Sequence, residues 1–451
     1  MGSLLFQSVR DNWAGGTRTR RCAAVFTVVC LLMIVAWGCR KAYVAWHVRA
    51  ARAALSEGNA GLALVALRQA EPYARTDAEI LFLLARALRR HDELTDVHAY
   101  LDRAVLAGWP EDQVRHQRYL ILMQTGNFNQ AENYLTQILG AGSVSDELAA
   151  EIYEARVKGY FSIYDLKEAL VCIEYWLKWR PHERQARMWR AEIWERTSVL
   201  QEAISDYRKV LEHDPKDFEA RLKLADALLL QHDVQGALGE YQKCVAGRPD
   251  DVAALLGVMK CQLRIGDLSQ AKTGLRALLE RDLSATQKGE VLLELGEMAL
   301  FNLDYPQAAD YLSQARVADP TNRFIYQPLS RAYARLGKTD LAEEAKRRGE
   351  EITKRFGRIS ELTNKMVLDP QNPELRYETG MLFFAEGATN DGAVWLLTAL
   401  KYDPEHRKTH AALADYYEGI GNAVAAGRHR RMAEASEKPG ADRSKSGSSS
   451  G

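Results

Sequence analysis

Small and large apolar side chains recur in the middle of the chain at the spacing expected of helices that pack in pairs. In the 34 residues 218–251 they stand at Leu224, Ala225, Leu228, Ala237 and Tyr241. Steps of three and four residues place side chains on one face of a helix. Pro249 closes the window, because a proline stops one helix before the next begins. The window therefore predicts two helices, each burying one face against the other.

The same frame returns in the next two windows along the chain. It falls at Val258, Met259, Gly266, Asp267, Leu268, Ala271, Leu275 and Leu278 in residues 252–285, and at Leu295, Gly296, Asp304, Tyr305, Ala308, Leu312 and Ala315 in residues 289–322. A small residue in the first helix, such as Gly296, admits the second helix at close range. The small residue of the second helix, such as Ala308, lies where the two helices cross. Gly266 turns the chain between helices, because glycine adopts backbone angles that other residues avoid.

Extended in both directions, the frame covers the chain from residue 44 to residue 433. Its units start near Val44, Ala78, Asp112, Ala150, Arg184, Phe218, Val252, Gly289, Arg323, Pro373 and Arg407. Most steps are 34 residues; the exceptions are 38, 37 and 50 residues, the last between the units that start at 323 and 373. The early units are degenerate, since Val97 replaces the small residue at the helix crossing of the second. A fixed period of this length indicates a repeat architecture.

This pattern resembles the tetratricopeptide repeat (TPR) family. The resemblance implies an all-α fold, a right-handed α-solenoid of about eleven helix-turn-helix units. It also implies that ligands bind in the concave groove, which first helices line. Chaperone-binding members hold a terminal carboxylate with a lysine and asparagine clamp, and the matching positions here do not carry that clamp.

The strongest hydrophobic segment lies near the N-terminus. Residues 23–39 form 17 consecutive residues without a charge. As a helix they span about 25 Å, and Tyr43, Val44 and Trp46 extend the apolar stretch toward the ~30 Å of a bilayer core. We expect one transmembrane helix, with Arg40 and Lys41 reaching to the interface. A buried soluble helix, a cleaved signal peptide and lipidation at Cys39 are the alternatives; Trp37 fits poorly before a cleavage or lipidation site.

The charges around this segment decide little about orientation. Four basic residues precede it and four follow it within a short distance, and the cluster at residues 18–21 favours an N-terminus inside. We therefore expect a single-pass membrane protein with its solenoid on the non-cytoplasmic side. With the repeats, the anchor makes the chain resemble membrane-anchored bacterial TPR proteins. No helix breaker follows the span, so helix is expected to continue from the bilayer into the first repeat.

These observations divide the chain into seven segments. They are a basic tail (1–22), a transmembrane helix (23–43), degenerate TPR units (44–149), regular TPR units (150–339), a long or extra helix (340–372), C-terminal TPR units (373–433) and a disordered tail (434–451). The segment 340–368 is helical in character and dense in charge. It either elongates one helix harmlessly or, kinked at Gly349 or Gly357, projects from the stack or joins two sub-arrays.

The composition and the motifs of the chain argue against several classes of function. The 60 basic and 60 acidic side chains give a net charge of zero, which argues against nucleic acid as the main partner. Six cysteines without a CxxC pair argue against a zinc or redox site, and Cys172, Cys244 and Cys261 are expected to be buried. No P-loop, GxSxG, HExxH or GxGxxG motif is present. His406 and His410 share a helix face without an evident third metal ligand. We expect no enzyme activity, cofactor, metal or small-molecule substrate.

A partner protein or peptide in the concave groove is therefore the predicted function. Candidate groove residues are Trp189, Leu222, Asp226, Leu256, Lys260, Leu293, Glu297 and Arg331. Trp189 stands beside Arg187 and Arg190, and an exposed tryptophan among arginines suits a binding hot spot; packing in the core is its alternative. A second hypothesis is a structural subunit of a cell-envelope assembly, and a third is a non-catalytic regulatory subunit of an envelope enzyme.

Overall fold

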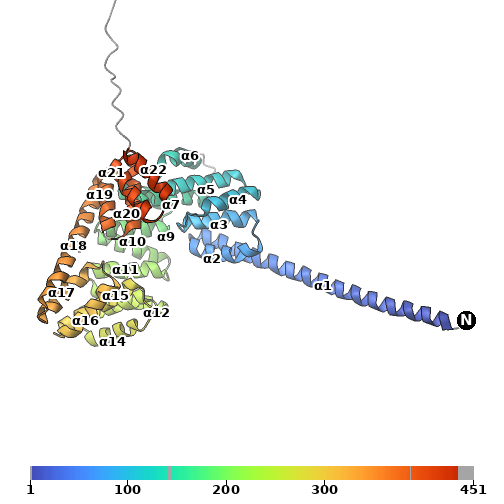
Figure 1. Ribbon diagram of the computed structural model, residues 1–451, viewed down its shortest axis with the longest axis horizontal. Helices are drawn as coiled ribbons and strands as arrows, with labels where there is room; N and C mark the ends of the chain where they lie inside the picture. Colours follow the sequence, from blue (N-terminus) through green and yellow to red (C-terminus); the bar gives the residue numbers. More distant parts are fainter. Residues whose placement is uncertain (1–2, 141–143, 386, 435–451) are drawn as a thin grey trace, which may run out of the picture. The chain divides into compact units, whose positions relative to one another are not determined.

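The computed structural model describes residues 3–140, 144–385 and 387–434. Within them the chain forms 22 α-helices, two short 3₁₀ helices and no strand (Figure 1). The predicted all-α solenoid of helix-turn-helix units is confirmed. The chain divides into two compact units, residues 1–155 and 156–451, which are described separately. The predicted disordered tail lies, from residue 435 onward, outside the described residues.

The first unit begins with one long helix followed by paired short helices. Its elements are α1 (Ser3–Ser56), α2 (Ala60–Ala70), η1 (Glu71–Tyr73), α3 (Ala78–Arg90), α4 (Val97–Leu106), α5 (Glu111–Gln124), α6 (Phe128–Gly140) and the first part of α7 (Asp146–Ser162). Within this unit, α1 packs on α2, α3 on α4, and α5 on α6. The helix α1 is continuous, so the apolar N-terminal segment and the first helix of the first repeat form one element.

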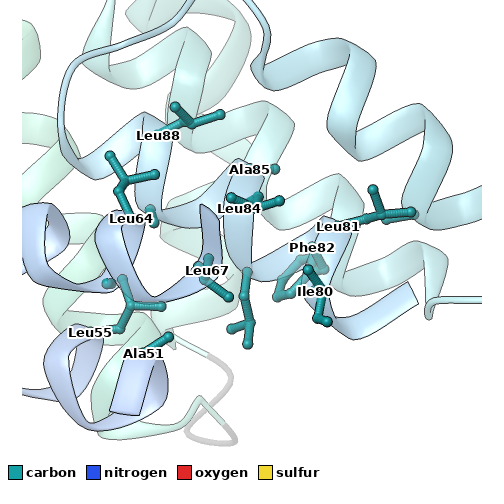
Figure 2. Packing of buried hydrophobic residues seen from close by; sticks show 14 of the residues in the cluster. Ala51, Leu55, Leu64, Leu67, Ile80, Leu81, Phe82, Leu84, Ala85 and Leu88 are labelled. Atoms are coloured by element: carbon teal, nitrogen blue, oxygen red, sulfur yellow. The ribbon is translucent and has the colours of Figure 1, made fainter. Parts of the chain in front are cut away.

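The end of α1 is fixed by its turn and its core. Gly58 adopts a φ of +81°, and the Asn59 side chain then accepts a hydrogen bond from the Leu62 backbone N–H at 3.0 Å, starting α2. Ala51 and Leu55 of α1 pack in one apolar cluster with leucines of α2 and α3 (Figure 2). Because its C-terminal turns are buried there, α1 is held by the first repeat.

The second unit continues the succession of helix pairs. After the last residues of α7 its elements are α8 (Leu166–Trp179), α9 (Arg184–Arg196), α10 (Leu200–His213), α11 (Phe218–Leu230), α12 (Val234–Gly247), α13 (Val252–Ile265), α14 (Leu268–Leu279), α15 (Ala285–Phe301), α16 (Tyr305–Ala318), η2 (Arg323–Ile325), α17 (Tyr326–Arg335), α18 (Thr339–Leu368), α19 (Pro373–Ala385), α20 (Thr389–Tyr402), α21 (Arg407–Gly419) and α22 (Ala423–Glu434).

The repeat frame found in the sequence locates the first helices closely. Helices α3, α9, α11, α13, α19 and α21 begin at the residue that the frame names, and η2 begins at Arg323. α5 begins one residue before the frame position, and α7 and α15 begin four residues before it. The two larger differences fall where the step departs from 34 residues, because an insertion before a first helix lengthens that helix by one turn.

Small residues perform the packing role expected of them. Ala237, Ala271 and Ala308 are completely buried. A Cβ atom added to Gly296 would lie 2.5 Å from Cγ of Leu312 on the second helix of the same pair, so only glycine fits there. Gly266 has a φ of +95° and ends α13 in the left-handed conformation. Cys172, Cys244 and Cys261 are buried, as expected.

The 50-residue step is occupied by α18, a single helix of 30 residues. Ala342, Ala345 and Ile352 in its first half are buried in the cluster built around α17. Leu362 and Met366 in its second half are buried too, and α18 packs on α19. At ~1.5 Å per residue the helix is about 45 Å long, which lets it serve two successive pairs. It joins the array before it to the array after it.

Candidate partner-binding groove

The candidate groove residues come from five successive first helices of the second unit. Trp189 lies on α9, Leu222 and Asp226 on α11, Leu256 and Lys260 on α13, Leu293 and Glu297 on α15, and Arg331 on α17. First helices contact each other across the repeats: α11 contacts α13, α13 contacts α15, and α15 contacts α17. A side chain on the same face of each helix therefore joins a row along the array.

Two of the eight candidates belong to the core. Leu256 is 4% exposed and packs with Leu275 and Val291, and Leu293 is 9% exposed and packs in the cluster of α15 to α17. Leu222 is half-buried at the edge of a neighbouring cluster. Leu256 and Leu293 therefore offer little exposed surface, whereas Asp226 and Lys260 are half-buried and Glu297 and Arg331 are exposed.

A tyrosine from the second helix holds Asp226 in place. The Tyr241 hydroxyl donates a 2.5 Å hydrogen bond to Oδ1 of Asp226. Burial raises the pKa of Asp226, although the Tyr241 hydrogen bond and nearby Lys223 act to lower it. The preceding repeat has the same device, since the Tyr207 hydroxyl donates to Oε1 of Glu195 at 3.1 Å. Glu195 was missed by sequence reasoning; tyrosine recurring at 207 and 241, one period apart, was the available signal.

An acidic stripe on α15 faces the lysine of α13. Lys260 Nζ lies 2.9 Å from Oε2 of Glu290. Glu294, one turn further along α15, is half-buried, and burial raises its pKa to about 7 against the lowering effect of Lys260. Glu297 completes the stripe; burial raises its pKa as well, and Arg331 opposes the rise. Glu290 and Glu294 were not predicted, but their spacing of i, i+4 and i+7 with Glu297 places all three on one helix face.

Trp189 is half-buried among aromatic rings. Its ring centroid lies 6.0 Å from that of Phe161, edge to face, and 6.2 Å from that of Trp176. The neighbouring arginines are engaged inside the repeat: Arg187 Nη1 lies 3.2 Å from Asp206, and Arg190 donates two hydrogen bonds of 2.7 Å to the same carboxylate. The structure therefore keeps Trp189 apart from free guanidinium groups.

The corresponding first-helix face of the first unit is filled by a buried ion network. Arg89 of α3 is completely buried and donates to Gln117 and Gln124 of α5 at 2.8 and 3.2 Å, while also pairing with Glu151 of α7. Arg86 also binds Glu151. Burial would raise the pKa of Glu151, but the surrounding arginines outweigh it and lower the pKa to about 2. With its charges matched internally, this face offers few groups to a ligand.

The predicted absence of a metal or cofactor site stays an expectation. Within the part of the chain that the structure describes, no three His, Cys, Asp or Glu side chains are grouped as metal ligands. His406 bonds to Thr409 and Glu374, and His410 bonds to His429 and the Pro404 carbonyl. Each histidine thus has local partners.

The comparisons with known proteins agree with this geometry. Two models of the tetratricopeptide repeat match the chain, at residues 200–252 and 228–287, which lie in α10 to α15. Residues 200–287 therefore match tetratricopeptide repeats. No curated protein matches the chain in sequence.

Several solved structures resemble parts of the fold. The MamA protein is 19% identical over 38% of this chain and 92% of its own, with a TM-score of 0.31. A tetratricopeptide repeat protein from Parabacteroides merdae is 16% identical over 64% of this chain and 98% of its own, with a TM-score of 0.34. PilW, a type IV pilus biogenesis factor, is 19% identical over 45% of this chain and 91% of its own, with a TM-score of 0.39.

Proposed function

We propose that this TPR protein is a non-enzymatic scaffold, anchored in a membrane by α1, that binds a partner protein or peptide along the first helices α9, α11, α13, α15 and α17. TPR arrays present extended surfaces because each repeat contacts only its neighbours, and such arrays mediate protein–protein interactions. Affinity is then gathered over several repeats.

The observation that carries the proposal is the line of charged groups on α13, α15 and α17. The charge changes sign from helix to helix: Lys260 lies on α13, Glu294 and Glu297 on α15, and Arg331 on α17. Glu294 is also half-buried, with a raised pKa. A carboxyl group held partly out of water costs stability unless it gains a partner. Charges of opposite sign on successive first helices suit a peptide with a complementary row of charges, and the half-buried Leu222 offers it an apolar contact.

The membrane part of the proposal is supported by α1. The described apolar side chains of this segment, among them Phe26, Leu32 and Trp37, are largely exposed, with Leu32 63% exposed. The helix is long and apolar enough to cross a bilayer, by length and composition. A signal sequence shares these properties, and it would be missing from the mature protein. Intact mass measurement of the protein extracted from membranes distinguishes the two.

Groove binding is tested by quantitative capture from detergent-solubilised membranes, using Lys260→Glu and Arg331→Glu. Both substitutions reverse a charge on a first helix, Lys260 on α13 and Arg331 on α17, so both variants are expected to lose the same captured proteins. Arg276→Glu is the matched control: Arg276 is exposed and lies on the second helix α14. If the control loses the same proteins, or neither groove variant loses any, the groove does not bind them.

Membrane topology is tested on intact cells. A protease added from outside is expected to digest the repeats while an internal marker protein survives, because the basic cluster at residues 18–21 favours an N-terminus inside. Protection of the repeats until the membrane is opened would place them on the cytoplasmic side.

A second candidate function, a subunit packed within a larger envelope assembly, is favoured by one observation. Leu230, Ile265 and Phe301 are 62%, 45% and 74% exposed, and each stands at the C-terminal end of a first helix in successive repeats. A row of exposed apolar side chains suits a permanent neighbour. Phe301→Ser is expected to release the protein from a large complex on a native gel while captures that depend on Arg331 persist.

A further inference from the structure

We propose that the base of α1 carries a binding site for the headgroup of an anionic glycerophospholipid. The inference rests on the proposed membrane anchor. Eight side chains of α1 and five residues at the start of the first repeats line a cleft of about 620 Å³: Trp37, Arg40, Lys41, Val44, Ala45, Val48, Arg49, Arg52, Tyr73, Ala74, Asp77, Glu79 and Ile80. This set is called the juxtamembrane cleft below.

The α1 residues of the juxtamembrane cleft form one continuous stripe. From Trp37 to Arg52 they follow steps of three, one, three, one, three, one and three residues, which is the spacing of a single helix face. The stripe faces the segment 73–80, which links η1 to α3. The cleft is therefore built by the packing of α1 on its own first repeat, within one compact unit.

Charge inside the juxtamembrane cleft is unequal. Four basic side chains line it, against the carboxylates of Asp77 and Glu79. Both carboxylates are occupied: Asp77 accepts hydrogen bonds from the backbone N–H groups at the start of α3, and Glu79 pairs with Arg52. Two positive charges remain in excess over acidic groups in the lining.

The excess charge is carried by groups without an acidic partner. Lys41 Nζ lies 3.9 Å from the centroid of the Trp37 ring, and Arg40 Nε donates to the Tyr73 carbonyl at 3.1 Å. Among the described residues, neither of these groups nor Arg49 forms an ion pair with a carboxylate. Guanidinium and ammonium groups poised this way bind phosphate oxygens.

The position of these basic residues along α1 indicates that the phosphate belongs to a lipid headgroup. The uncharged stretch ends at Cys39, and Arg40 is the first charged residue after it. Headgroup regions extend about 5–8 Å beyond each side of the hydrocarbon core, which corresponds to roughly four or five residues of an upright helix. A ~30 Å core that starts at residue 23 takes about 20 residues and ends near residue 42. Arg40 and Lys41 then reach headgroup level from just inside the core edge, and Arg49 lies about 10 Å beyond that edge, just above the headgroups. The aromatic rings of Trp37 and Tyr43 lie where interfacial aromatics concentrate.

An anionic headgroup fits better than a zwitterionic one. Phosphatidylcholine brings its own ammonium group, which would meet the excess positive charge of the juxtamembrane cleft with repulsion. A headgroup such as that of phosphatidylglycerol carries only the negative charge of its phosphodiester. Its hydroxyl groups can also donate hydrogen bonds to backbone carbonyls near Tyr73. Basic pockets at the membrane surface recognise anionic lipids through this difference.

The test is a lipid titration of the full chain in detergent, followed by native mass spectrometry, with dioleoyl phosphatidylglycerol and dioleoyl phosphatidylcholine as probes. Wild type is expected to prefer the anionic lipid. The double variant Lys41→Gln with Arg49→Gln is expected to bind it about tenfold more weakly, with the zwitterionic lipid unchanged. Lys41→Arg with Arg49→Lys keeps both charges and is expected to keep the preference.

The matched control is Arg68→Gln with Arg75→Gln. It removes the same number of charges from exposed positions of the same unit outside the juxtamembrane cleft, and is expected to retain the preference. Equal losses in the two double variants, or none in either, overturn the inference. Alkaline extraction of membranes reports on the anchor separately: protein that stays in the membrane without lipid preference overturns only the lipid site, whereas protein that is extracted overturns the anchor and the lipid site with it.

Discussion

The Tyr241 hydroxyl donates a 2.5 Å hydrogen bond to Asp226 and so ties the second helix of one repeat to its first helix at the face where a partner is proposed to bind. Burial raises the pKa of the Tyr241 phenol, which keeps the phenol protonated as the donor. One repeat earlier, Tyr207 and Glu195 make the same link at 3.1 Å. In both links a neutral tyrosine hydroxyl orients the carboxyl group.

Tyr241→Phe is expected to lower the free energy of unfolding by about 1–2 kcal/mol, because the half-buried Asp226 would lose its hydrogen-bond donor. The measurement is the denaturant midpoint of the full chain in detergent. Tyr311→Phe on α16 is the control, since no hydrogen bond of its hydroxyl is found among the described residues. Equal effects of the two substitutions would contradict a specific role for the Tyr241 hydroxyl.

Glu151→Gln is expected to destabilise the first unit by about 3 kcal/mol, because the completely buried Arg89 would lose its charged partner. Hydrogen exchange of α3 and α7 peptides measures this locally. Glu147→Gln is the control: Glu147 binds Arg86 from an exposed position, and its loss should cost less than about 1 kcal/mol. Similar exchange rates in the two variants would show that the network contributes little.

The same network predicts a pH dependence. The pKa of Glu151 is about 2 in the folded chain and lies near 4 when unfolded. Between these values the unfolded state binds more protons, so the contribution of Glu151 is present in full above about pH 5 and declines as the pH falls toward 2. Wild type should therefore lose more protection in α3 than Glu151→Gln between pH 5 and pH 3, and parallel losses would argue against the pairing.

For Glu294 we predict the opposite pH dependence, in which stability falls as the pH rises. Burial raises its folded pKa to about 7, above its unfolded value, so the folded state binds more protons between about pH 4 and pH 7. Its ionisation therefore destabilises the fold as the pH rises through 7. Glu294→Gln should be more stable than wild type at pH 8 and differ less at pH 5, measured as thermal midpoints. A difference that does not change with pH would contradict the burial of this carboxyl group.

Two glycine substitutions test the close packing of the repeats. Gly296→Ala is expected to destabilise by about 1–3 kcal/mol, because its Cβ would lie 2.5 Å from Cγ of Leu312. Gly239→Ala on the second helix α12 meets no atom within 4 Å and is expected to stabilise by about 0.5–1 kcal/mol through helix propensity. Both are checked by denaturant midpoints, and a shift of the same sign in both would show that local packing does not decide the outcome.

Much of the fold was predictable because the helices of each repeat pack through residues that lie at fixed, short spacings in the sequence. Ala237, Ala271 and Ala308 mark the helix crossings, and six first helices begin at the residue named by the frame. The candidate groove was predictable only in part. Leu256 and Leu293 were chosen by position, but both are buried, because a repeat position specifies a helix face and leaves the burial of that face to its neighbours.

The sequence by itself determined the helices, their pairing and the apolar N-terminal segment, since each depends on residues a few positions apart. The tertiary structure decided which charges meet. Arg89 and Glu151 are 62 residues apart in the chain, and Lys260 and Glu290 are 30 apart. The juxtamembrane cleft likewise needs α1 and the segment 73–80 together. Charge and burial depend on distances in space that pattern and period do not encode, so the helical repeat architecture was evident from the sequence and the proposed binding surfaces were not.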